Sequence, residues 1–409
     1  MPAAVVEVAL LESAANGVTL NPAQAQLVRE MATSGARLQL AIAPAGSGKT
    51  TAMAVLARAW TDGGGTVIGL APSAVAASVL REQIGSRTDT LAKLTWSLTH
   101  DPMPGWVRDI DSSTLVVIDE AGMAGTTDLA AAVDYITGKG GAVRLVGDDQ
   151  QLASVAAGGV LRDIAETAGA VTLSELIRFK DPAEGAASLA LRTGDDAGIG
   201  FYLDHDRVHV GDLSTATDAA YSAWSVDRGG GLDSIMLAPT RDLVAVLNAR
   251  ARADRLLAES PAVGREVTLA DGNRASAGDT IITRANERRL VISASDWVKN
   301  GDRWTVTKVH RGGALDVQHL RTARHVILPA AYVAVSAELG YAATVHGAQG
   351  VTTDTCHSVA TGDESRQLFY VAMTRGRTGN DVYLVTAGNG DPHSVIKPET
   401  VRPLSLIHI

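Results

Sequence analysis

The segment from Ala41 to Met53, AIAPAGSGKTTAM, constrains the fold of this chain more than any other feature. Residues 43–50 read A-x-x-x-x-G-K-T, which differs from the phosphate-binding loop G-x-x-x-x-G-K-[ST] only in its first position. An apolar run, RLQLAIAP, precedes the loop, and an Ala- and Leu-rich segment with helical character follows it. This order of strand, loop and helix places backbone N–H groups at a helix N-terminus, which is a natural anion site. The segment therefore predicts a nucleotide site.

Each residue type in this loop has a chemical reason. Gly46 and Gly48 have no Cβ, so the backbone N–H groups can curl around phosphate oxygens. Lys49 can reach the β- and γ-phosphates, and the Thr50 hydroxyl can ligate Mg²⁺. A glycine-rich turn that binds nothing is the alternative, and the order of strand, loop and helix argues against it. The loop residues expected to contact the nucleotide are Ala45, Gly46, Ser47, Gly48, Lys49, Thr50 and Thr51.

Two later apolar segments end in acids and amides. LVVIDEAGMAG places Asp119 where it can ligate Mg²⁺ and Glu120 where it can act as the base for an attacking water. LVGDDQQLASV places Gln151 where it could sense the γ-phosphate or its water, although a polar turn explains this residue equally well. Adjacent Asp and Glu residues at the end of a strand are common by chance. They become informative here because they accompany the phosphate loop.

Composition limits the class of protein. A length of 409 residues suggests two to four domains, and 46% hydrophobic with 20% charged residues is typical of a soluble globular chain. No apolar run is as long as a membrane span and residues 1–20 do not resemble a signal peptide, so a cytoplasmic location is expected. The single cysteine, Cys356, excludes a disulfide framework within the chain. The net charge of −9 argues against a protein that coats nucleic acid non-specifically.

The pattern of apolar runs predicts an α/β fold with one irregular insert. Short apolar strands separated by helical segments indicate parallel sheets; they are TVIGLAP (66–72), TLVVIDEAG (114–122), AVRLVGDDQ (142–150), SIMLAPT (234–240) and NDVYLVTA (380–387). Residues 274–324 instead alternate around Gly and Asn turns without helices, which predicts a small antiparallel barrel. This stretch holds ten Lys or Arg and five Asp or Glu residues, so it is about +5 in an acidic chain.

Three further segments extend these motifs into an ordered set: LSELIRF (173–179), ELGYAATVHGAQGVT (338–352) and QLFYVAMTRGR (367–377). Together with the phosphate loop, the set resembles superfamily 1 helicases of the RecD-like, 5′-to-3′ branch. It is most similar to the helicase portion of TraI/TrwC-type conjugative relaxases. The resemblance runs from about residue 18 to residue 387, and it is the order of the motifs that makes it specific.

The resemblance implies roles for residues outside the phosphate loop. Gln24 would contact adenine, and Arg178 and Arg375 would face the γ-phosphate across a domain cleft. The residues implied to touch single-stranded DNA are Pro72, Ser73, Thr90, Thr344 and His346, while Gln349 and Gly350 would link the DNA to the nucleotide. The sequence departs from the family pattern at Ala92, where many relatives carry His, and at Gly347 and Ala348, where RecD-like proteins often carry Lys-Ser.

The resemblance also implies two tandem RecA-like P-loop NTPase lobes, with a small SH3-like antiparallel β-barrel inserted in the second. The expected boundaries are 1–180 for the first lobe, 181–273 and 336–395 for the halves of the second lobe and 274–335 for the insert, with 396–409 as a tail outside the fold. The implied activity is ATP hydrolysis, dependent on Mg²⁺, that drives 5′-to-3′ movement on single-stranded DNA and unwinds duplexes. The implied partners are single-stranded DNA, junctions of single- and double-stranded DNA, and a relaxase domain on a longer parent chain or other conjugation proteins.

Two other hypotheses remain open at this point. The chain could be a DNA-binding scaffold that has lost hydrolysis. The candidate catalytic residues argue against this; they are Lys49, Asp119, Glu120, Gln151, Arg178 and Arg375. It could instead be the ATPase subunit of a RecD-like recombination complex that acts only with partners. An assay of nucleotide hydrolysis distinguishes the scaffold from an active helicase. Unwinding by the isolated chain distinguishes an independent helicase from a subunit that needs partners.

Overall fold

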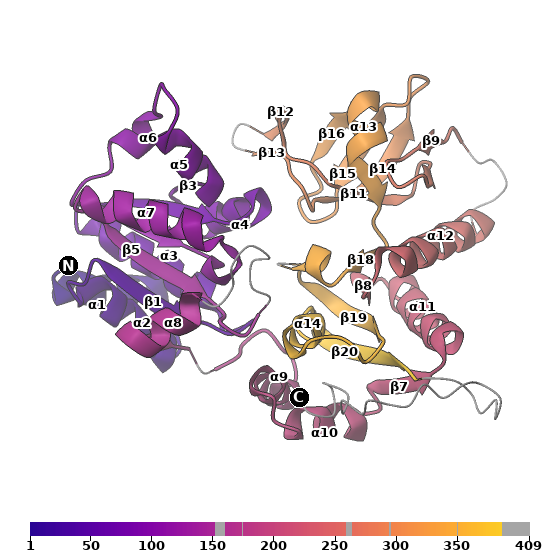
Figure 1. Cartoon of the computed structure of the whole chain (residues 1–409), viewed down its shortest axis with the longest axis horizontal. Coiled ribbons are helices and arrows are strands. Elements are labelled where there is room, and N and C mark those ends of the chain that lie inside the picture. The colour runs from indigo at the N-terminus through magenta and orange to yellow at the C-terminus, as the bar shows by residue number, and fades with distance from the viewer. Residues whose placement is uncertain (152–159, 174, 259–263, 294–295, 350, 387–409) are drawn as a thin grey trace. The chain divides into compact units, whose positions relative to one another are not determined.

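The structure is a computed structural model, and it describes residues 1–151, 160–173, 175–258, 264–293, 296–349 and 351–386. The chain divides into two compact units, Met1–Gly185 and Ala186–Ile409 (Figure 1). Gly350 and the expected tail at 396–409 lie outside the described residues.

A six-stranded sheet forms the centre of the first unit, and every pairing in it is parallel. The predicted strands at 66–72, 114–122 and 142–150 are all present, each ending a few residues earlier than the apolar segment that predicted it. The order across the sheet is β3 (Arg87–Thr90), β2 (Thr66–Ala71), β4 (Thr114–Ile118), β5 (Ala142–Gly147), β1 (Leu38–Ile42) and β6 (Val171–Thr172).

Both faces of this sheet are covered by helices, because successive side chains of a strand point to opposite faces. In β4, Leu115 and Val117 join one hydrophobic cluster, while Val116 and Ile118 join the other. The first cluster packs against α1 (Ala3–Ala15), α2 (Pro22–Thr33), α3 (Lys49–Asp62) and α4 (Ala74–Ile84). The second packs against α5 (Leu91–Leu98), α7 (Thr126–Gly138) and α8 (Val160–Ala168), with the short α6 (Gly105–Arg108) between α5 and β4 in sequence.

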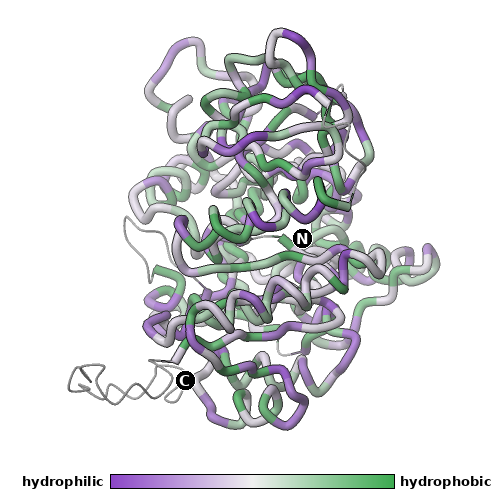
Figure 2. Tube along the Cα trace, turned by 90° about the vertical axis from the view of Figure 1, so that its right-hand side faces the viewer, coloured by the Kyte–Doolittle hydropathy of each residue, from purple (hydrophilic) through white to green (hydrophobic). Residues whose placement is uncertain are grey.

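The second unit contains a five-stranded parallel sheet that includes the two remaining predicted strands. Its order is β18 (Ala342–Thr344), β8 (Ser234–Ala238), β19 (Thr353–Ala360), β20 (Gly376–Val385) and β7 (Val208–Gly211). The helices of this part are α9 (Pro182–Thr193), which crosses the boundary between the units, and α10 (Ala197–Asp204), α11 (Leu213–Gly229), α12 (Arg241–Ala258) and α14 (Arg366–Ala372). Helices and strands in Figure 2 show both green and purple stretches, as expected for elements with one face against a core.

An antiparallel module is inserted between α12 and β18, as predicted. Its main sheet has the order β16 (His325–Leu328), β15 (Leu315–His319), β14 (Arg303–Val309), β11 (Thr280–Thr283) and β17 (Ala337–Leu339). Smaller pairs join β9 (Val267–Thr268) to β10 (Arg274–Ala275) and β12 (Glu287–Ser293) to β13 (Asp296–Val298), and α13 (Ala330–Ser336) follows β16. The module extends past the expected limits 274–335, because β9 precedes them and β17 pairs with β11 beyond them.

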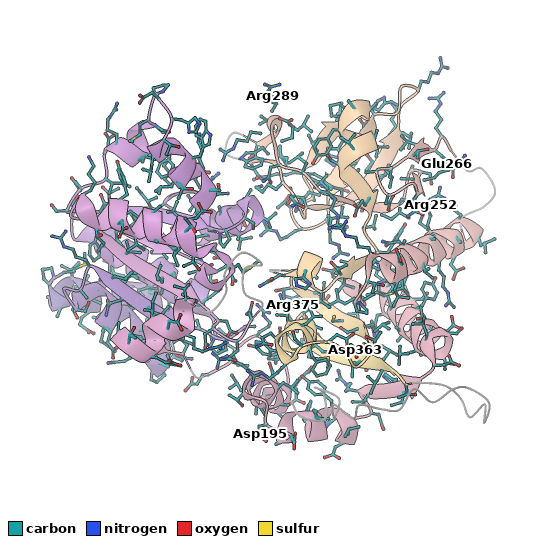
Figure 3. The ribbon with its side chains drawn as sticks, in the orientation of Figure 1. Asp195, Arg252, Glu266, Arg289, Asp363 and Arg375 are labelled. Atoms are coloured by element: carbon teal, nitrogen blue, oxygen red, sulfur yellow. The ribbon has the colours of Figure 1, made fainter. Side chains whose placement is uncertain are left out.

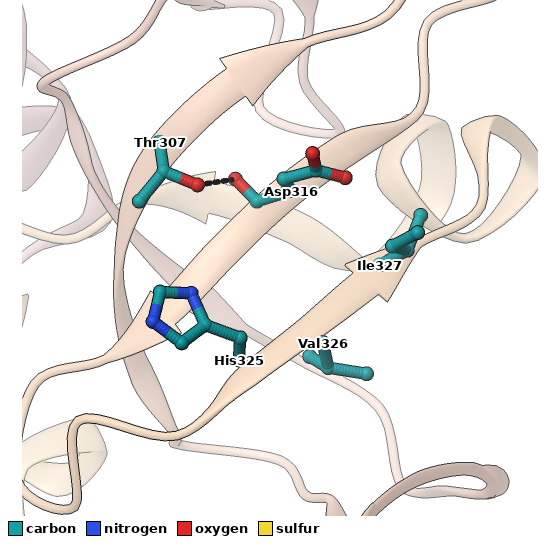
Figure 4. Close-up of a pocket in the computed structure, with 5 residues that line it drawn as sticks. All are labelled: Thr307, Asp316, His325, Val326 and Ile327. Carbon is teal, nitrogen blue, oxygen red and sulfur yellow. Dashed lines mark hydrogen bonds between the residues drawn. The ribbon is translucent and has the colours of Figure 1, made fainter.

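The module and the parallel sheet of the second unit share one hydrophobic core. Trp304, which is completely buried in β14, belongs to the same cluster as Trp224 of α11 and Leu247 of α12. One small surface pocket, with a volume of about 290 Å³, lies on the module and is lined by Thr307, Asp316, His325, Val326 and Ile327 (Figure 4). None of these five residues was predicted to belong to a site.

A buried carboxylate ties the module to α12. Asp279 is fully buried and accepts hydrogen bonds from Arg252 Nε at 3.1 Å, Arg255 Nε at 2.9 Å and the Tyr341 hydroxyl at 2.7 Å. It also accepts the backbone N–H of Ser276 at 2.7 Å. A second carboxylate, Glu266, pairs with Arg252, and both are labelled in Figure 3. Because each buried charge has several partners, the desolvation cost of this group is offset by directed contacts.

Among the helices that the structure describes, none is both long enough and apolar enough to cross a membrane.

Replacement of Asp279 by Ala should destabilise the second unit strongly. The change leaves the two arginines of α12 without their buried counter-charge, and removing one partner of a buried pair costs about 3–5 kcal/mol. Hydrogen exchange of the β11 and β14 amides under increasing urea measures this loss. Asp218→Ala removes an exposed partner of Arg250 and should cost less than about 1 kcal/mol. Equal losses in the two variants would contradict the role given to Asp279.

Candidate active site

The predicted catalytic side chains of the first unit meet at one edge of its sheet. The strands β4, β5 and β1 are neighbours in the sheet, and all three run parallel. The phosphate loop follows β1, Asp119 follows β4 and Asp148 follows β5. Parallel strands place their carboxyl ends at the same edge, where open α/β sheets bind ligands. Residues that are up to about a hundred positions apart are thereby brought together.

The backbone of the phosphate loop uses conformations that favour glycine. Gly46 has φ +87° and Gly48 has φ +69°, and Lys49 begins α3 directly after the loop. A Cβ on Gly46 would lie 2.6 Å from Cβ of Arg178, which is closer than real Cβ contacts. The Ala43 N–H donates to the Gly147 carbonyl at 2.8 Å, so the start of the loop is fixed to the end of β5. Both glycines are therefore favoured by conformation, and a Cβ on either of them would also lie too close to a neighbouring side chain.

Lys49 is the centre of a partly buried charge cluster. Its Nζ lies 3.0 Å from Asp119 Oδ1 and 2.5 Å from Glu120 Oε1. Burial lowers the pKa of the Lys49 ammonium, but attraction to the two carboxylates and their hydrogen bonds outweigh burial and raise this pKa above its ordinary value. Burial raises the pKa of the Asp119 carboxyl; Lys49 opposes that change and the charge of Glu120 adds to it. The lysine is firmly protonated, and the two acids share one counter-charge.

Glu120 is held in an unusual backbone conformation. Its φ is +51°, in the left-handed region that residues with a Cβ avoid, and the 3-10 helix η1 (Ala121–Met123) begins directly after it. The Glu120 N–H donates to Asp119 Oδ1 at 2.9 Å, which stabilises the turn. The turn directs the Glu120 side chain toward Lys49. Strain at such a position is characteristic of functional sites.

Asp148 connects the end of β5 to the phosphate loop. Its Oδ2 accepts the Ala45 N–H at 3.3 Å and the Gln151 side-chain amide at 3.2 Å, and its Oδ1 accepts the Gln150 N–H. Gln151 is therefore linked to the loop through Asp148, and its contact with a nucleotide stays a prediction. The resemblance to superfamily 1 helicases implies a coupling role for Gly147, Asp148 and Gln151, but the DDQQ run does not itself indicate which of its four polar residues contacts the loop.

Arg178 also contacts the loop, and it does so from within the first unit. The Gly46 carbonyl accepts the N–H groups of Ile177 at 2.8 Å and Arg178 at 3.1 Å. Arg178 precedes the boundary at Gly185, as the expected limit of residue 180 for the first lobe implies, and its action on the γ-phosphate stays a prediction. The segment returns to the loop because β6 is the edge strand beside β1, so the residues that follow β6 pass the end of β1.

The loop offers the kind of ligands that a magnesium ion requires. Thr50 is the second residue of α3 and supplies a hydroxyl, while Asp119, whose carboxylate reaches Lys49 at the start of the same helix, supplies a hard anionic oxygen. Thr51 donates its N–H to the Gly48 carbonyl at 3.1 Å. The Ser47 hydroxyl is buried and has no hydrogen-bond partner among the residues that the structure describes. These donors match an ion that is bound jointly by a protein and a phosphate.

Gln24 lies under the loop, at the first turn of α2. Its side chain is buried, and its Nε2 donates to the carbonyls of Ser47 at 3.2 Å and Gly48 at 3.1 Å. Its Oε1 accepts the Asn21 N–H at 3.0 Å, and its own N–H donates to Asn21 Oδ1 at 2.8 Å. This reciprocal pair is a capping box that begins α2, with Pro22 at the first helical position.

Three residues of the first unit that were predicted to touch DNA lie after strands at the same edge of the sheet. Pro72 and Ser73 follow β2, and the Ser73 hydroxyl caps α4 by accepting the Ala76 N–H at 3.1 Å. Thr90 ends β3, and its hydroxyl caps α5 by accepting the Lys93 N–H at 3.1 Å. Both hydroxyls have local structural roles, and their contact with DNA stays a prediction.

The second unit carries the other predicted residues. Thr344 ends β18 and accepts the Gly347 N–H at 3.1 Å, and His346 begins the 3-10 helix η2 (His346–Ala348). Gln349 follows η2, and its Nε2 is buried without a hydrogen-bond partner in the described part of the chain. These residues lie at the carboxyl end of a parallel strand, which is the edge expected for ligands.

Arg375 lies between α14 and β20 (Figure 3). Only 3% of its surface is exposed, and its guanidinium donates to the Val371 carbonyl at 2.8 Å, the Thr374 hydroxyl at 2.8 Å and the Val351 carbonyl at 3.3 Å. The side chain is thus fixed between two segments of the second unit. Whether it acts on a nucleotide stays a prediction.

Comparison with known sequences identifies relatives over most of the chain. A family model described as an AAA domain matches residues 19–213. The probable conjugal transfer protein TraA of Sinorhizobium fredii is 31% identical over 351 residues, and TraA of Agrobacterium fabrum is 31% identical over 355 residues. Each match covers 85% of this chain and 31% of the relative. The chain therefore spans about a third of the length of these conjugal transfer proteins.

Comparison with solved structures identifies the fold. Pif1 helicase from Bacteroides, in complex with ADP-AlF3 and single-stranded DNA, superposes with a TM-score of 0.59 at 17% identity and covers 89% of this chain and 92% of its own. Pif1 from Candida albicans has a TM-score of 0.56 at 18% identity, with 89% and 94% covered. The prediction of an α/β fold with two tandem RecA-like lobes and an antiparallel insert is confirmed.

Replacement of Asp119 by Asn should change the dependence of stability on pH. Because the folded protein raises the pKa of this carboxyl above its ordinary value of 3.8, the wild-type protein loses stability as pH rises through the raised folded pKa. The variant lacks that loss, so its free energy of unfolding relative to wild type should increase from acidic to neutral pH. Urea unfolding at several pH values measures the difference. A difference that falls as pH rises would contradict the raised pKa.

Proposed function

We propose that the chain is a RecD- and Pif1-like superfamily 1 helicase that hydrolyses ATP to move 5′-to-3′ along single-stranded DNA and to separate duplex strands. The observation that carries the proposal is the cluster of Lys49, Asp119 and Glu120 at the phosphate loop, with Asp148 and Gln151 beside it. These are the groups needed to bind a triphosphate and activate water. A scaffold without hydrolysis would have no reason to maintain the strained backbone of Glu120.

The chain's own residues divide the work of hydrolysis. Lys49 binds the β- and γ-phosphate oxygens, and its ion pairs with Asp119 and Glu120 keep it protonated beforehand. When Lys49 turns to the triphosphate, Glu120 is released to orient the attacking water and accept its proton. Asp119 and Thr50 would hold Mg²⁺, which supplies charge neutralisation for the phosphate oxygens. Gln151 and Ala45 both donate a hydrogen bond to Asp148, which follows β5. A movement of the phosphate loop at Ala45 would therefore be passed through Asp148 to Gln151.

Coupling to DNA is assigned to residues on both units. Pro72, Ser73 and Thr90 in the first unit, and Thr344 and His346 in the second, would contact the strand. Gln349, Gly350 and Arg375 would link strand contact to the nucleotide. Arg375 is suited to the task because its guanidinium is connected to both Val351, which follows the Gln349–Gly350 segment, and Val371 of α14. A nucleotide that recruits this arginine would therefore affect both segments.

The biological setting we propose is conjugative DNA transfer, with the chain as the helicase module of a longer relaxase. Matches to conjugal transfer proteins cover 85% of the chain, whereas a match to the RecBCD subunit RecD of Mycolicibacterium smegmatis covers 29%. A relaxase domain on the same polypeptide or other conjugation proteins are the partners this setting requires. Unwinding by the isolated chain of a duplex with a 5′ tail, and not with a 3′ tail, tests polarity and independence from partners together.

Replacement of Lys49 by Ala should reduce ATP hydrolysis by about 100- to 1,000-fold, because the charge that stabilises the transferring phosphoryl group is lost. Phosphate release with and without a single-stranded oligonucleotide measures the effect. The wild-type protein should be stimulated by the oligonucleotide, and more weakly as salt is raised. Lys139→Ala, which removes an exposed lysine that lies over the Tyr135 ring, is the matched control and should hydrolyse ATP normally. Equal activity in the two variants would refute the site.

Replacement of Arg375 by Ala should lower the rate of hydrolysis by about 1,000-fold while nucleotide affinity changes little, as expected for an arginine that acts in the transition state. Arg377, two residues further along the chain in β20, is exposed and pairs with Asp354, so Arg377→Ala serves as the control. Steady-state kinetics and nucleotide titration separate the two effects. A variant whose affinity and thermal stability fall together with its rate would show that Arg375 is a structural residue only.

A further inference from the structure

Asn248 of α12 is a buried polar side chain outside the candidate active site. It is 2% exposed, and both polar atoms of its amide bond to the backbone of one short segment. Its Nδ2 donates to the carbonyls of Leu339 at 3.2 Å and Ala342 at 3.3 Å. Its Oδ1 accepts the N–H groups of Tyr341 at 2.9 Å and Ala342 at 2.8 Å. A single side chain thus holds four backbone groups of residues 339–342.

The segment 339–342 joins the antiparallel insert to the parallel sheet of the second unit. It begins at the last residue of β17 and ends at the first residue of β18. On the side of the insert, the Gly340 N–H donates to the Thr280 carbonyl at 2.9 Å. A Cβ at Gly340 would lie 2.9 Å from the backbone carbonyl carbon of Ile281, so the segment passes close against β11. On the other side, Asn248 holds it from α12, which lies beside β18 (Figure 1).

The strand β18 depends on such support because it is a short edge strand. It has three residues, and in the sheet that the structure describes it pairs with β8 alone. The open side of an edge strand presents N–H and C=O groups, and such groups cost free energy when they are buried without partners. An asparagine amide carries the same donor and acceptor as a peptide group, and Asn248 bonds to both the N–H and the carbonyl of Ala342. It therefore takes the place of a further strand beside β18.

The residues that follow β18 include two of the proposed DNA contacts. Thr344 is the last residue of β18, and its hydroxyl accepts the Gly347 N–H at 3.1 Å, while His346 begins η2. Their position depends on the register of β18, in which Ala342 lies opposite Met236. A slip of one residue would turn Thr344 to the opposite face of the sheet and break its bond to Gly347.

We propose that Asn248 is a positioning residue for Thr344 and His346. It fixes the register of β18 from the open edge, and through β18 it fixes the two side chains. The inference rests on the proposed function for the role of those two residues in DNA binding. It also connects the insert to DNA binding, because the segment that Asn248 holds is the one by which the insert joins the sheet.

The test replaces Asn248 by Leu, which has the same branched shape and no hydrogen-bonding group. In native-state hydrogen exchange the Gly347 amide should exchange about tenfold faster in the variant, because its bond to Thr344 opens more often. Affinity for a fluorescent single-stranded oligonucleotide, measured by anisotropy, should fall by about tenfold, which corresponds to the loss of one or two hydrogen bonds. Affinity for ATP without DNA should stay as in wild type, since the phosphate loop belongs to the first unit. Asn248→Ala, which avoids any crowding by Leu, should give the same changes.

Val317→Ala is the control for a general loss of stability. Val317 is completely buried in β15 of the insert, where it lies opposite Val306 and Val326. Its truncation removes buried apolar volume and should lower the melting temperature, while oligonucleotide affinity stays as in wild type. Equal weakening of oligonucleotide binding in Asn248→Leu and Val317→Ala would overturn the proposal. Wild-type affinity in both Asn248 variants would overturn it as well.

Failure of the proposed function has a different signature. A wild-type protein that does not bind the oligonucleotide would refute the assignment of DNA contacts to Thr344 and His346. The Gly347 amide would still decide the role of Asn248, because its exchange does not depend on DNA. A rate that is the same in wild type and in the Asn248 variants would overturn the positioning role, and a faster rate in the variants alone would support it.

Discussion

The parallel arrangement of β4, β5 and β1 is the constraint on which the candidate active site depends. Each strand is followed by one functional segment at the same edge of the sheet. The phosphate loop, Asp119 and Asp148 therefore come together although they are far apart in the sequence. The sheet can keep this arrangement because both of its faces are buried by separate hydrophobic clusters. A strand that slipped by one residue would turn its apolar side chains to the wrong cluster and move its loop out of the site.

Much of this architecture could be predicted from sequence because its signals are local. The phosphate loop is a contiguous motif, and the strands from Thr66, Thr114 and Ala142 are continuous apolar runs between helical segments. The boundaries of the antiparallel insert were predicted less accurately. Its last strand, Ala337–Leu339, is recognised as part of the insert only through its pairing with β11, which is more than fifty residues earlier.

The contacts of polar side chains were harder to predict for a physical reason. A glutamine or an aspartate has several alternative partners of similar energy, and the tertiary structure decides among them. The amide of Gln24 donates to two carbonyls of the phosphate loop, a contact that the sequence does not indicate, and its contact with a base stays a prediction. Asp148 is one of four adjacent polar residues, and only its position after β5 brings it to Ala45. Arg178 was expected to face the γ-phosphate, and the edge position of β6 brings its backbone to the loop of the first unit.

In the second unit, the antiparallel insert is attached to the parallel domain by both apolar and charged contacts. A shared hydrophobic core joins Trp304 of the insert to the helices of the parallel domain, and Asp279 adds directional bonds to two arginines of α12. Apolar contact alone would hold the insert without fixing its orientation. The charged contacts fix that orientation because their geometry is satisfied in only one arrangement.

The backbone of Glu120 has a consequence for how this protein would drift under mutation. At φ +51°, glycine would relieve the strain at this position, and asparagine would tolerate the conformation better than glutamate does. A population selected only for folding would therefore replace glutamate at position 120, whereas one selected for turnover would retain it. Under the proposed function, the glutamate at position 120 is therefore a residue that turnover requires and that folding alone would not choose.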